Sequence, residues 1–188
     1  AIIDTEFVMK LPKGLTAVSG MDALTHALEA RVSCMQSDYC NALANEAVSL
    51  IFKNLPECYN NGPMNEKARE HMFNASAMAG MAFANAFLGL CHSMAHKLGG
   101  MYHVPHGLAN SFLINHIIKF NAVDCMTKQA AFPQYQYPNA KADYAAVARY
   151  VGLQGKDDDE LIAALIEKID ELKSLLDIPK SMKPWFDA

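Results

Sequence analysis

The chain has 188 residues, of which 52% are hydrophobic and 19% charged, and its net charge is −4. This length is sufficient for one well-buried core, and the composition excludes a disordered or fibrous protein. With 16 basic against 20 acidic residues and no basic face, the sequence also argues against nucleic acid as a partner.

The N-terminal part is predicted to be a short strand followed by helices. Residues 1–4 (AIID) resemble a buried strand, and the segment 11–14 (LPKG) breaks regular structure. Apolar residues then recur at three- and four-residue spacing over 20–33, which predicts a helix. A second helix is capped by Ser37 or Asp38 and runs through Leu55, and Pro56 with the segment 60–63 (NNGP) ends it.

The rest of the chain is predicted to be helical as well. A long helix rich in Ala and Met begins at Asn65 and extends to about Leu88. Its methionines (Met72, Met78 and Met81), with Met94 and Met101 beyond it, are interpreted as core residues. Further helices cover 89–98, 107–120, 140–151 and 158–176, with the acidic residues 157–159 at the start of the last one. Gly99 and Gly100 stop the first of these, and residues 131–138 form a loop. The sequence therefore predicts one all-α domain of about seven helices.

Histidines gather in the window 89–110, which reads GLCHSMAHKLGGMYHVPHGLAN. This window holds His92, His96, His103 and His106, four of the seven histidines of the chain. A second motif, GMDALTHALEA, places Asp22 and His26 four residues apart, so a helix projects both from one face. Three imidazoles and one carboxylate could form the ligand set of a divalent metal, because histidine is the commonest metal ligand.

Isolated histidines are more often hydrogen-bonded residues than ligands, and we keep that interpretation for His103, which neighbours Tyr102 in a turn. The spacing does not select the metal, since Fe(II), Zn(II), Mn(II) and Co(II) all suit nitrogen and oxygen ligands. Cys91 adjoins His92 but faces another side of the helix and is interpreted as a core residue. The sequence contains no Gly-x-Gly-x-x-Gly, Walker or Gly-x-Ser-x-Gly motif.

The two histidine motifs together resemble the iron-containing, or group III, alcohol dehydrogenases. The match is closest to the alcohol dehydrogenase half of bifunctional aldehyde–alcohol dehydrogenases. It extends through the segment 127–138 (TKQAAFPQYQYP), in which Phe-Pro-Gln-Tyr points to that branch. The resemblance implies a helical, dehydroquinate synthase-like C-terminal domain over residues 1–188. It also implies that residues 1–10 are the remnant of a segment leading from an α/β dinucleotide-binding domain that this sequence lacks.

The same resemblance implies roles for individual residues. Asp22, His26, His92 and His106 would bind the catalytic metal, typically Fe²⁺, with Zn²⁺ as the alternative. His96 would lie beside the nicotinamide and the substrate as a catalytic and cofactor-binding residue, and Phe83 would line the substrate cleft. The implied reaction is reversible hydride transfer between NAD and a short primary alcohol or its aldehyde, with NAD binding dependent on the missing domain. We expect the full-length parent to be a homo-oligomer.

Several features bear on completeness and location. The chain opens on AII without Met, and its end, KPWFDA, departs from the family pattern, so we expect a fragment of a longer protein. The five cysteines contain no Cys-x-x-Cys pair, which favours reduced thiols in the cytoplasm. The longest apolar run is interrupted by Asn74, Ser76 and Asn85, so we expect no membrane partner, and no secretory signal is visible.

Two alternatives from other classes stay open. One is a non-catalytic helical module that uses a metal for stability or assembles with copies of itself. The other is a metal-dependent hydrolase that activates a bound water, for which Glu29 is the nearby candidate for a general base.

Overall fold

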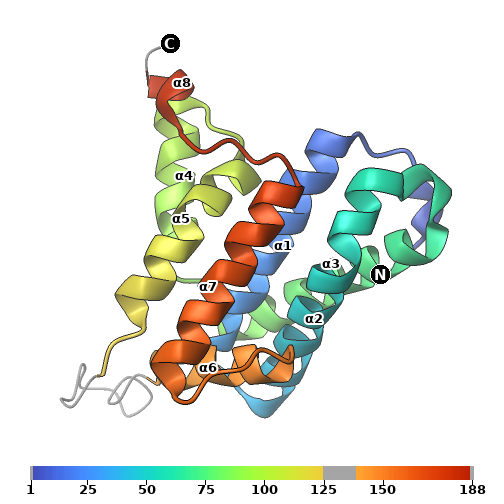
Figure 1. Cartoon of the computed structure of the whole chain (residues 1–188). Helices are drawn as coiled ribbons and strands as arrows, with labels where there is room; N and C mark the ends of the chain where they lie inside the picture. Colours follow the sequence, from blue (N-terminus) through green and yellow to red (C-terminus); the bar gives the residue numbers. More distant parts are fainter. Residues whose placement is uncertain (1, 125–138, 187–188) are drawn as a thin grey trace.

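Helices make up most of the computed structural model, which describes residues 2–124 and 139–186 (Figure 1). No strand occurs within these ranges, so the all-α fold class is confirmed. The longer helices correspond to the predicted ones, and the predicted loop over 131–138 lies outside the described residues. In chain order, the elements are the 3-10 turn η1 (Thr5–Phe7), α1 (Lys13–Arg31), α2 (Asp38–Asn61), the 3-10 turn η2 (Gly62–Met64), α3 (Glu66–Ala86), α4 (Leu90–Tyr102), α5 (His106–Asn121), α6 (Ala140–Tyr150), α7 (Asp158–Leu175) and the four-residue α8 (Lys183–Phe186).

Three helices begin at side-chain caps that the sequence indicates. The Ser37 hydroxyl accepts a hydrogen bond from the backbone N–H of Cys40 at the start of α2. Asn65 caps α3 in the same way at 3.0 Å, and Asp157 caps α7 at 2.9 Å. Each cap satisfies a backbone donor that would otherwise lack a partner in the first helical turn, which is why these helices start where the sequence predicts.

The predicted N-terminal strand is wrong. Residues 2–4 have no regular structure, Ile2 is 93% exposed, and Asp4 caps the turn η1 instead. A strand needs a neighbouring strand for its backbone hydrogen bonds, and the described residues offer none. The predicted breaker is the start of α1, because Pro12 occupies the N-cap position, where its missing N–H costs nothing.

Two predicted helix ends are also wrong. Pro56 lies inside α2, which continues past Leu55 despite the loss of one helical hydrogen bond. The helix ends at Asn61, within the predicted stop segment 60–63. Gly99 and Gly100 lie inside α4, which ends only at Tyr102, where His103 adopts a left-handed conformation with φ of 54°. Packing of the surrounding helix therefore outweighs the local preference of proline and glycine at these positions.

α1 lies at the centre of the bundle and packs against α2, α3 and α5. Small residues allow these helices to come close together. Gly20 of α1 faces Leu55 of α2 so closely that a Cβ atom at position 20 would overlap the leucine side chain. The buried face of α3 consists of fully buried alanines at three- and four-residue spacing, namely Ala75, Ala79, Ala82 and Ala86. The alternation of glycine and alanine with larger side chains thus fixes a tightly packed helical core.

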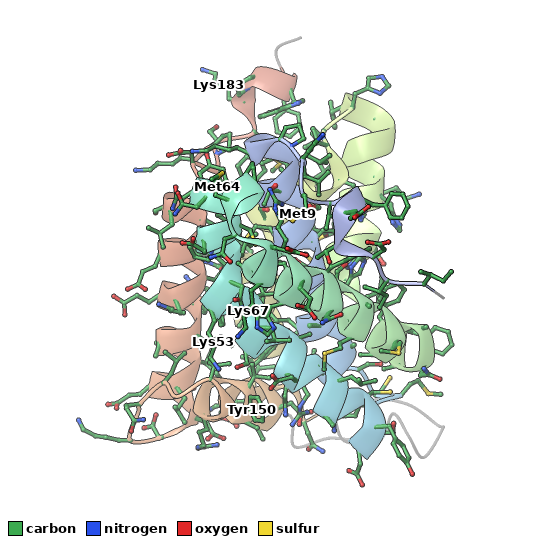
Figure 2. The ribbon with its side chains drawn as sticks, turned by 90° about the vertical axis from the view of Figure 1, so that its right-hand side faces the viewer. Met9, Lys53, Met64, Lys67, Tyr150 and Lys183 are labelled. Carbon is green, nitrogen blue, oxygen red and sulfur yellow. The ribbon has the colours of Figure 1, made fainter. Side chains whose placement is uncertain are left out.

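The methionines only partly fill the core. Met72 and Met78 are half-buried against it, whereas Met81, Met94 and Met101 are at least 40% exposed, so the prediction is wrong for these three. Most charged side chains lie on the outer faces, as Figure 2 shows for Lys53 of α2 and Lys67 of α3, both exposed. Glu29, Arg31 and Arg69 are buried instead.

No single described helix combines the length and the apolar character needed to cross a bilayer. α3 and α4 meet the length and composition criteria only as a pair, and that pair is bent by 105°.

Candidate metal centre

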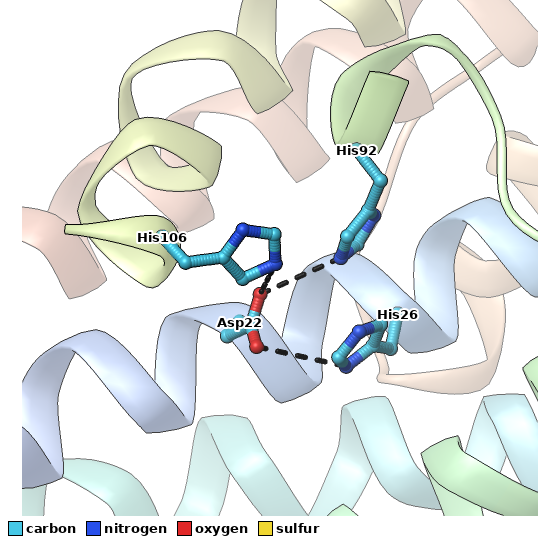
Figure 3. A group of neighbouring side chains, drawn as sticks. All are labelled: Asp22, His26, His92 and His106. Atoms are coloured by element: carbon cyan, nitrogen blue, oxygen red, sulfur yellow. Dashed lines mark ion pairs between the residues drawn. The ribbon is translucent and has the colours of Figure 1, made fainter. Parts of the chain in front are cut away.

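The site is built on the middle of α1, where Asp22 and His26 lie one turn apart (Figure 3). Residues four positions apart in an α-helix share one face, so both side chains point toward the same space. Asp22 Oδ2 lies 3.9 Å from Nδ1 of His26, and both side chains are about one-fifth exposed. The ring of Phe83 stacks on the imidazole of His26, with centroids 4.5 Å apart, and this contact restricts the orientation of the imidazole.

The other two histidines come from the short helices α4 and α5. His92 lies in the first turn of α4 and is 2% exposed, whereas His106 is the first residue of α5 and its side chain is 40% exposed. Nε2 of His92 and Nε2 of His106 lie 3.4 Å and 3.3 Å from the same atom, Oδ1 of Asp22.

One ligand atom from each of Asp22, His26, His92 and His106 can be chosen so that all lie within 4.8 Å of one another. The rings of His26 and His92 stack at 4.4 Å between centroids. One nitrogen atom of each of the three histidines faces the carboxylate of Asp22 (Figure 3). Three imidazole nitrogens and one carboxylate oxygen are the donors that a divalent transition metal accepts. The structure thus brings together the four residues that the sequence singles out.

The chemistry of the donors fits a cation. Nε2 of His92 is buried and has no hydrogen-bond partner, which is costly for a polar atom unless another group satisfies it. It points toward the carboxylate of Asp22 and the other imidazoles. A bound metal would supply the missing partner for this atom.

Burial and neighbouring charged groups shift the pKa values of the clustered residues. Burial opposes the charged form of His92, but the nearby carboxylates of Asp22 and Glu29 outweigh burial and raise the pKa of His92 to about 9. Burial alone would raise the pKa of Asp22, yet the nearby His92 and His26 bring it below its ordinary value. Burial lowers the pKa of His26 to about 4, so this imidazole is neutral near pH 7 and available as a ligand.

Glu29 contacts the ring of His92 at the edge that faces away from the ligand group. Its Oε2 lies 2.6 Å from Nδ1 of His92, on the opposite edge of the ring from Nε2. The carboxylate also accepts hydrogen bonds from the backbone N–H groups of Cys91, at 2.7 Å, and His92, at 3.2 Å. Glu29 is 2% exposed and lies outside the group of four ligand atoms. The sequence signal for this contact is its position three residues after His26, on the same face of α1.

Asn110 is a site residue that the sequence analysis missed. It is fully buried, and its Nδ2 donates a hydrogen bond of 2.6 Å to Oδ1 of Asp22 and lies 3.3 Å from Nε2 of His106. Its backbone carbonyl and side-chain oxygen face the thiol of Cys91. The available signal was an asparagine one helical turn after His106 in an apolar helix.

The remaining candidates lie around this cluster. His96 is exposed, lies outside the ligand group, and stacks on His106 with centroids 5.2 Å apart. Phe83 is half-buried and contacts the cluster through His26. His103 is exposed and apart from the group, and Cys91 is buried in the core, as predicted for both.

Comparison with known proteins gives a consistent result. The chain is 58% identical over 183 residues to the aldehyde-alcohol dehydrogenase of Clostridium acetobutylicum. It is 49% identical over 187 residues to the bifunctional aldehyde-alcohol dehydrogenase AdhE of Escherichia coli K12. Each match covers 97% of the chain but only 21% of the relative, so the chain spans about one-fifth of the length of these proteins.

The fold is also that of solved relatives. A crystal structure of a 1,3-propanediol oxidoreductase superposes with a TM-score of 0.84 at 36% identity, covering 97% of this chain and 44% of that one. The model of the C-terminal part of the Fe-containing alcohol dehydrogenase family matches residues 16–185, which include all four clustered ligands. The resemblance inferred from the sequence is confirmed, and the chain belongs to the Fe-containing alcohol dehydrogenase family.

Proposed function

We propose that residues 1–188 form the metal-binding catalytic domain of an NAD-dependent enzyme that interconverts short primary alcohols and aldehydes. The observation that carries this proposal is the convergence of Asp22, His26, His92 and His106, from three helices, within 4.8 Å. Membership of the alcohol dehydrogenase family supports the reaction class, and the names of the aldehyde-alcohol dehydrogenase relatives support the substrate class.

The four side chains would hold one divalent metal ion, with Fe²⁺ as the expected occupant and Zn²⁺ as the alternative. When bound, the metal supplies a Lewis acid that polarises the substrate oxygen, and the nicotinamide accepts or donates the hydride. Asp22 brings the negative charge that offsets part of the metal charge. Because His106 is 40% exposed and the other three ligands are more buried, the substrate would approach from the side of His106.

His96 and Phe83 would act on the substrate side of the cluster. His96 is solvent-exposed beside His106, one helical turn from His92, so it could accept or return the alcohol proton without occupying a metal coordination position. Phe83 offers an apolar ring beside His26, which suits the hydrocarbon part of a short alcohol. We propose that His96 is a catalytic and nicotinamide-contacting residue and that Phe83 lines the substrate cleft.

The NAD site would lie mainly on a dinucleotide-binding domain outside this sequence. The relatives are much longer than this chain, and the sequence contains no glycine-rich phosphate-binding motif. We therefore propose that the isolated chain holds metal but binds NAD poorly, and that the full-length parent is a cytoplasmic homo-oligomer. The free thiols of Cys34, Cys40, Cys58 and Cys91 suit a reducing compartment.

The hydrolase alternative has less support than the dehydrogenase. It depends on Glu29 as the general base, but this carboxylate is buried against Nδ1 of His92 and two backbone N–H groups. A base must reach the water that it activates. Glu29 lies at the edge of the His92 ring opposite Nε2, so it does not face the ligand atoms. Among the described residues of the cluster, Asp22 is the one carboxylate, and it would bind the metal rather than act as the base.

Elemental analysis and activity assays of two proteins test the proposal. The purified chain should retain a divalent metal, and the full-length parent should reduce NAD in the presence of ethanol, whereas the chain alone should reduce it slowly or not at all. A parent that lacks alcohol-dependent NAD reduction while fully loaded with metal would contradict the proposed activity. A chain that retains metal but no dehydrogenase activity in any form would favour the metal-stabilised assembly module.

A further inference from the structure

A buried carboxylate outside the ligand group makes a short contact with one of the ligands. Oε2 of Glu29 lies 2.6 Å from Nδ1 of His92, and the two side chains are 1% and 2% exposed. Burying two ionisable groups together is costly unless their hydrogen bonds are well satisfied. The pair is therefore a specific arrangement that surrounding structure maintains.

The backbone of α4 fixes the orientation of the carboxylate. Oε1 of Glu29 accepts a hydrogen bond from the backbone N–H of Cys91, and Oε2 accepts hydrogen bonds from the backbone N–H and the ring Nδ1–H of His92. These N–H groups belong to the first turn of α4, where no earlier carbonyl is available to accept them. Glu29 thus connects the start of α4 to the middle of α1, and it meets the backbone and the side chain of His92 at once.

A glycine makes this close approach possible. A Cβ atom at position 89 would lie 2.8 Å from Oε1 of Glu29, closer than carbon and oxygen atoms come without a shift. Gly89 directly precedes α4, and its backbone angles, φ of −124° and ψ of −147°, do not require glycine through a positive φ. The need for glycine here comes from the space that the carboxylate occupies.

We propose that Glu29 is a positioning residue that sets which ring nitrogen of His92 faces the metal. By accepting a hydrogen bond from Nδ1–H, Glu29 makes Nε2 the nitrogen that carries the lone pair in the neutral imidazole, and Nε2 is the atom directed at Asp22 and the other ligands. The same contact holds the plane of the ring, and the negative charge makes the imidazole a stronger donor to a cation. This inference rests on the proposed function, because it assigns Glu29 a role toward the same metal.

A glutamine at position 29 tests the role of the charge with little change in volume. The amide of Glu29→Gln offers one acceptor oxygen and one NH₂ group, whereas the site presents three N–H donors, so at least one donor loses its acceptor. Glu167→Gln is the matched control, because Glu167 is exposed on α7 and the substitution removes the same charge outside the ligand group. Gly89→Ala is a second variant that keeps the carboxylate but displaces it, and Gly80→Ala, with open space around its Cβ, is its control.

The measurements are Zn²⁺ affinity of the purified chain by titration against a competing chelator and NMR spectroscopy of the His92 ring. We expect Glu29→Gln and Gly89→Ala to weaken Zn²⁺ binding by about 10- to 100-fold, and both controls to bind like the original chain. In the original chain the Nδ1–H proton of His92 should appear far downfield and exchange slowly, and this signal should be lost in Glu29→Gln. A merely structural role for Glu29 would not move that signal while circular dichroism shows a folded protein.

The outcomes separate this inference from the proposed function. If the original chain binds Zn²⁺ and folded Glu29→Gln binds equally well with an unchanged Nδ1–H signal, Glu29 has no positioning role, and the metal site stands. If the original chain binds no Zn²⁺, the proposed function fails first, and the role of Glu29 toward a metal fails with it. If Glu29→Gln does not fold, an unchanged affinity and Nδ1–H signal in Gly89→Ala would still overturn the inference.

Discussion

Gly107 packs directly against the backbone of Val18, and a Cβ atom at position 107 would overlap the Val18 carbonyl oxygen and lie 3.2 Å from Cβ of Asp22. The start of α5 therefore touches α1 at the turn that carries Asp22. This contact, between residues far apart in the sequence, is what places His106, the preceding residue, within 3.3 Å of the carboxylate.

Gly107→Ala should accordingly push α5 away from α1. We expect it to destabilise the chain by about 1–3 kcal/mol, the usual cost of overpacking, because the overlapping atom belongs to the backbone and cannot rotate away. Metal retention should fall, since His106 moves with α5. Thermal unfolding and metal analysis check both effects. Gly100→Ala, inside α4 with open space around its Cβ, should leave both properties intact; equal behaviour of the two variants would disprove the role of this contact.

Metal binding should strengthen as pH rises toward the pKa of His92, which lies at about 9. A metal ligand must be deprotonated, so each ion that binds below this pH displaces the His92 proton, and affinity should increase about tenfold per pH unit from this residue alone. His26, with a pKa of about 4, adds no proton near neutrality. Calorimetric titration with Zn²⁺ in buffers of different ionisation enthalpy measures the released protons, and an affinity that is flat with pH would contradict the account.

The metal-free fold should respond in the opposite sense. Because the pKa of His92 is raised above its ordinary value of 6.5, the charged histidine stabilises the folded chain below pH 6.5. This contribution is lost as pH rises through about 9. The free energy of unfolding of the metal-free chain, measured in urea, should therefore fall over this range, and a smaller fall is expected for Glu29→Gln, which removes one of the two carboxylates that hold the charge.

Core packing should dominate the stability of α7. Leu165 is fully buried in the hydrophobic core, so Leu165→Ala should lower the free energy of unfolding by about 2–5 kcal/mol. Leu175 lies on the same helix but is 54% exposed, and Leu175→Ala should cost roughly 0.5 kcal/mol or less. Urea unfolding of the two variants gives the comparison, and similar losses would mean that α7 does not pack as described.

His96 should affect activity without affecting the metal. In the full-length parent, His96→Ala is expected to lower kcat by about 10²- to 10⁴-fold, the range for a lost general acid–base group, with metal content unchanged because His96 lies outside the ligand group. The control is His103→Asn, which keeps a residue type that tolerates the left-handed backbone there. Loss of metal from His96→Ala would instead make His96 a ligand.

The parts of the fold that could be predicted from the sequence are those that depend on local signals. The side chains of Ser37, Asn65 and Asp157 mark the starts of three helices, because each satisfies backbone donors that are close in the sequence. The ends were harder to predict. Pro56 and Gly99 are strong breakers in isolation, but each lies in a helix whose packing against neighbours compensates for the local cost.

In the candidate site, too, local relationships could be predicted from the sequence and contacts between helices could not. Asp22 with His26 could be predicted, since i and i+4 positions of a helix share a face regardless of the rest of the fold. The contacts of Glu29 with His92 and of Asn110 with Asp22 cross between helices, 63 and 88 residues apart in the chain. They depend on how closely α1, α4 and α5 approach, which Gly89 and Gly107 permit. The positions of Glu29 and Asn110 in the sequence do not identify the residues that they contact.

Metal content of the purified chain, measured for the original sequence and for His92→Ala, tests the central proposal most directly. His92 is the most buried of the four ligands, and its Nε2 has no other partner, so its removal should eliminate high-affinity binding. We expect one metal ion per chain for the original sequence, almost none for His92→Ala, and full content for His116→Ala, which changes an exposed histidine of α5. Undiminished metal in folded His92→Ala would contradict the four-ligand site.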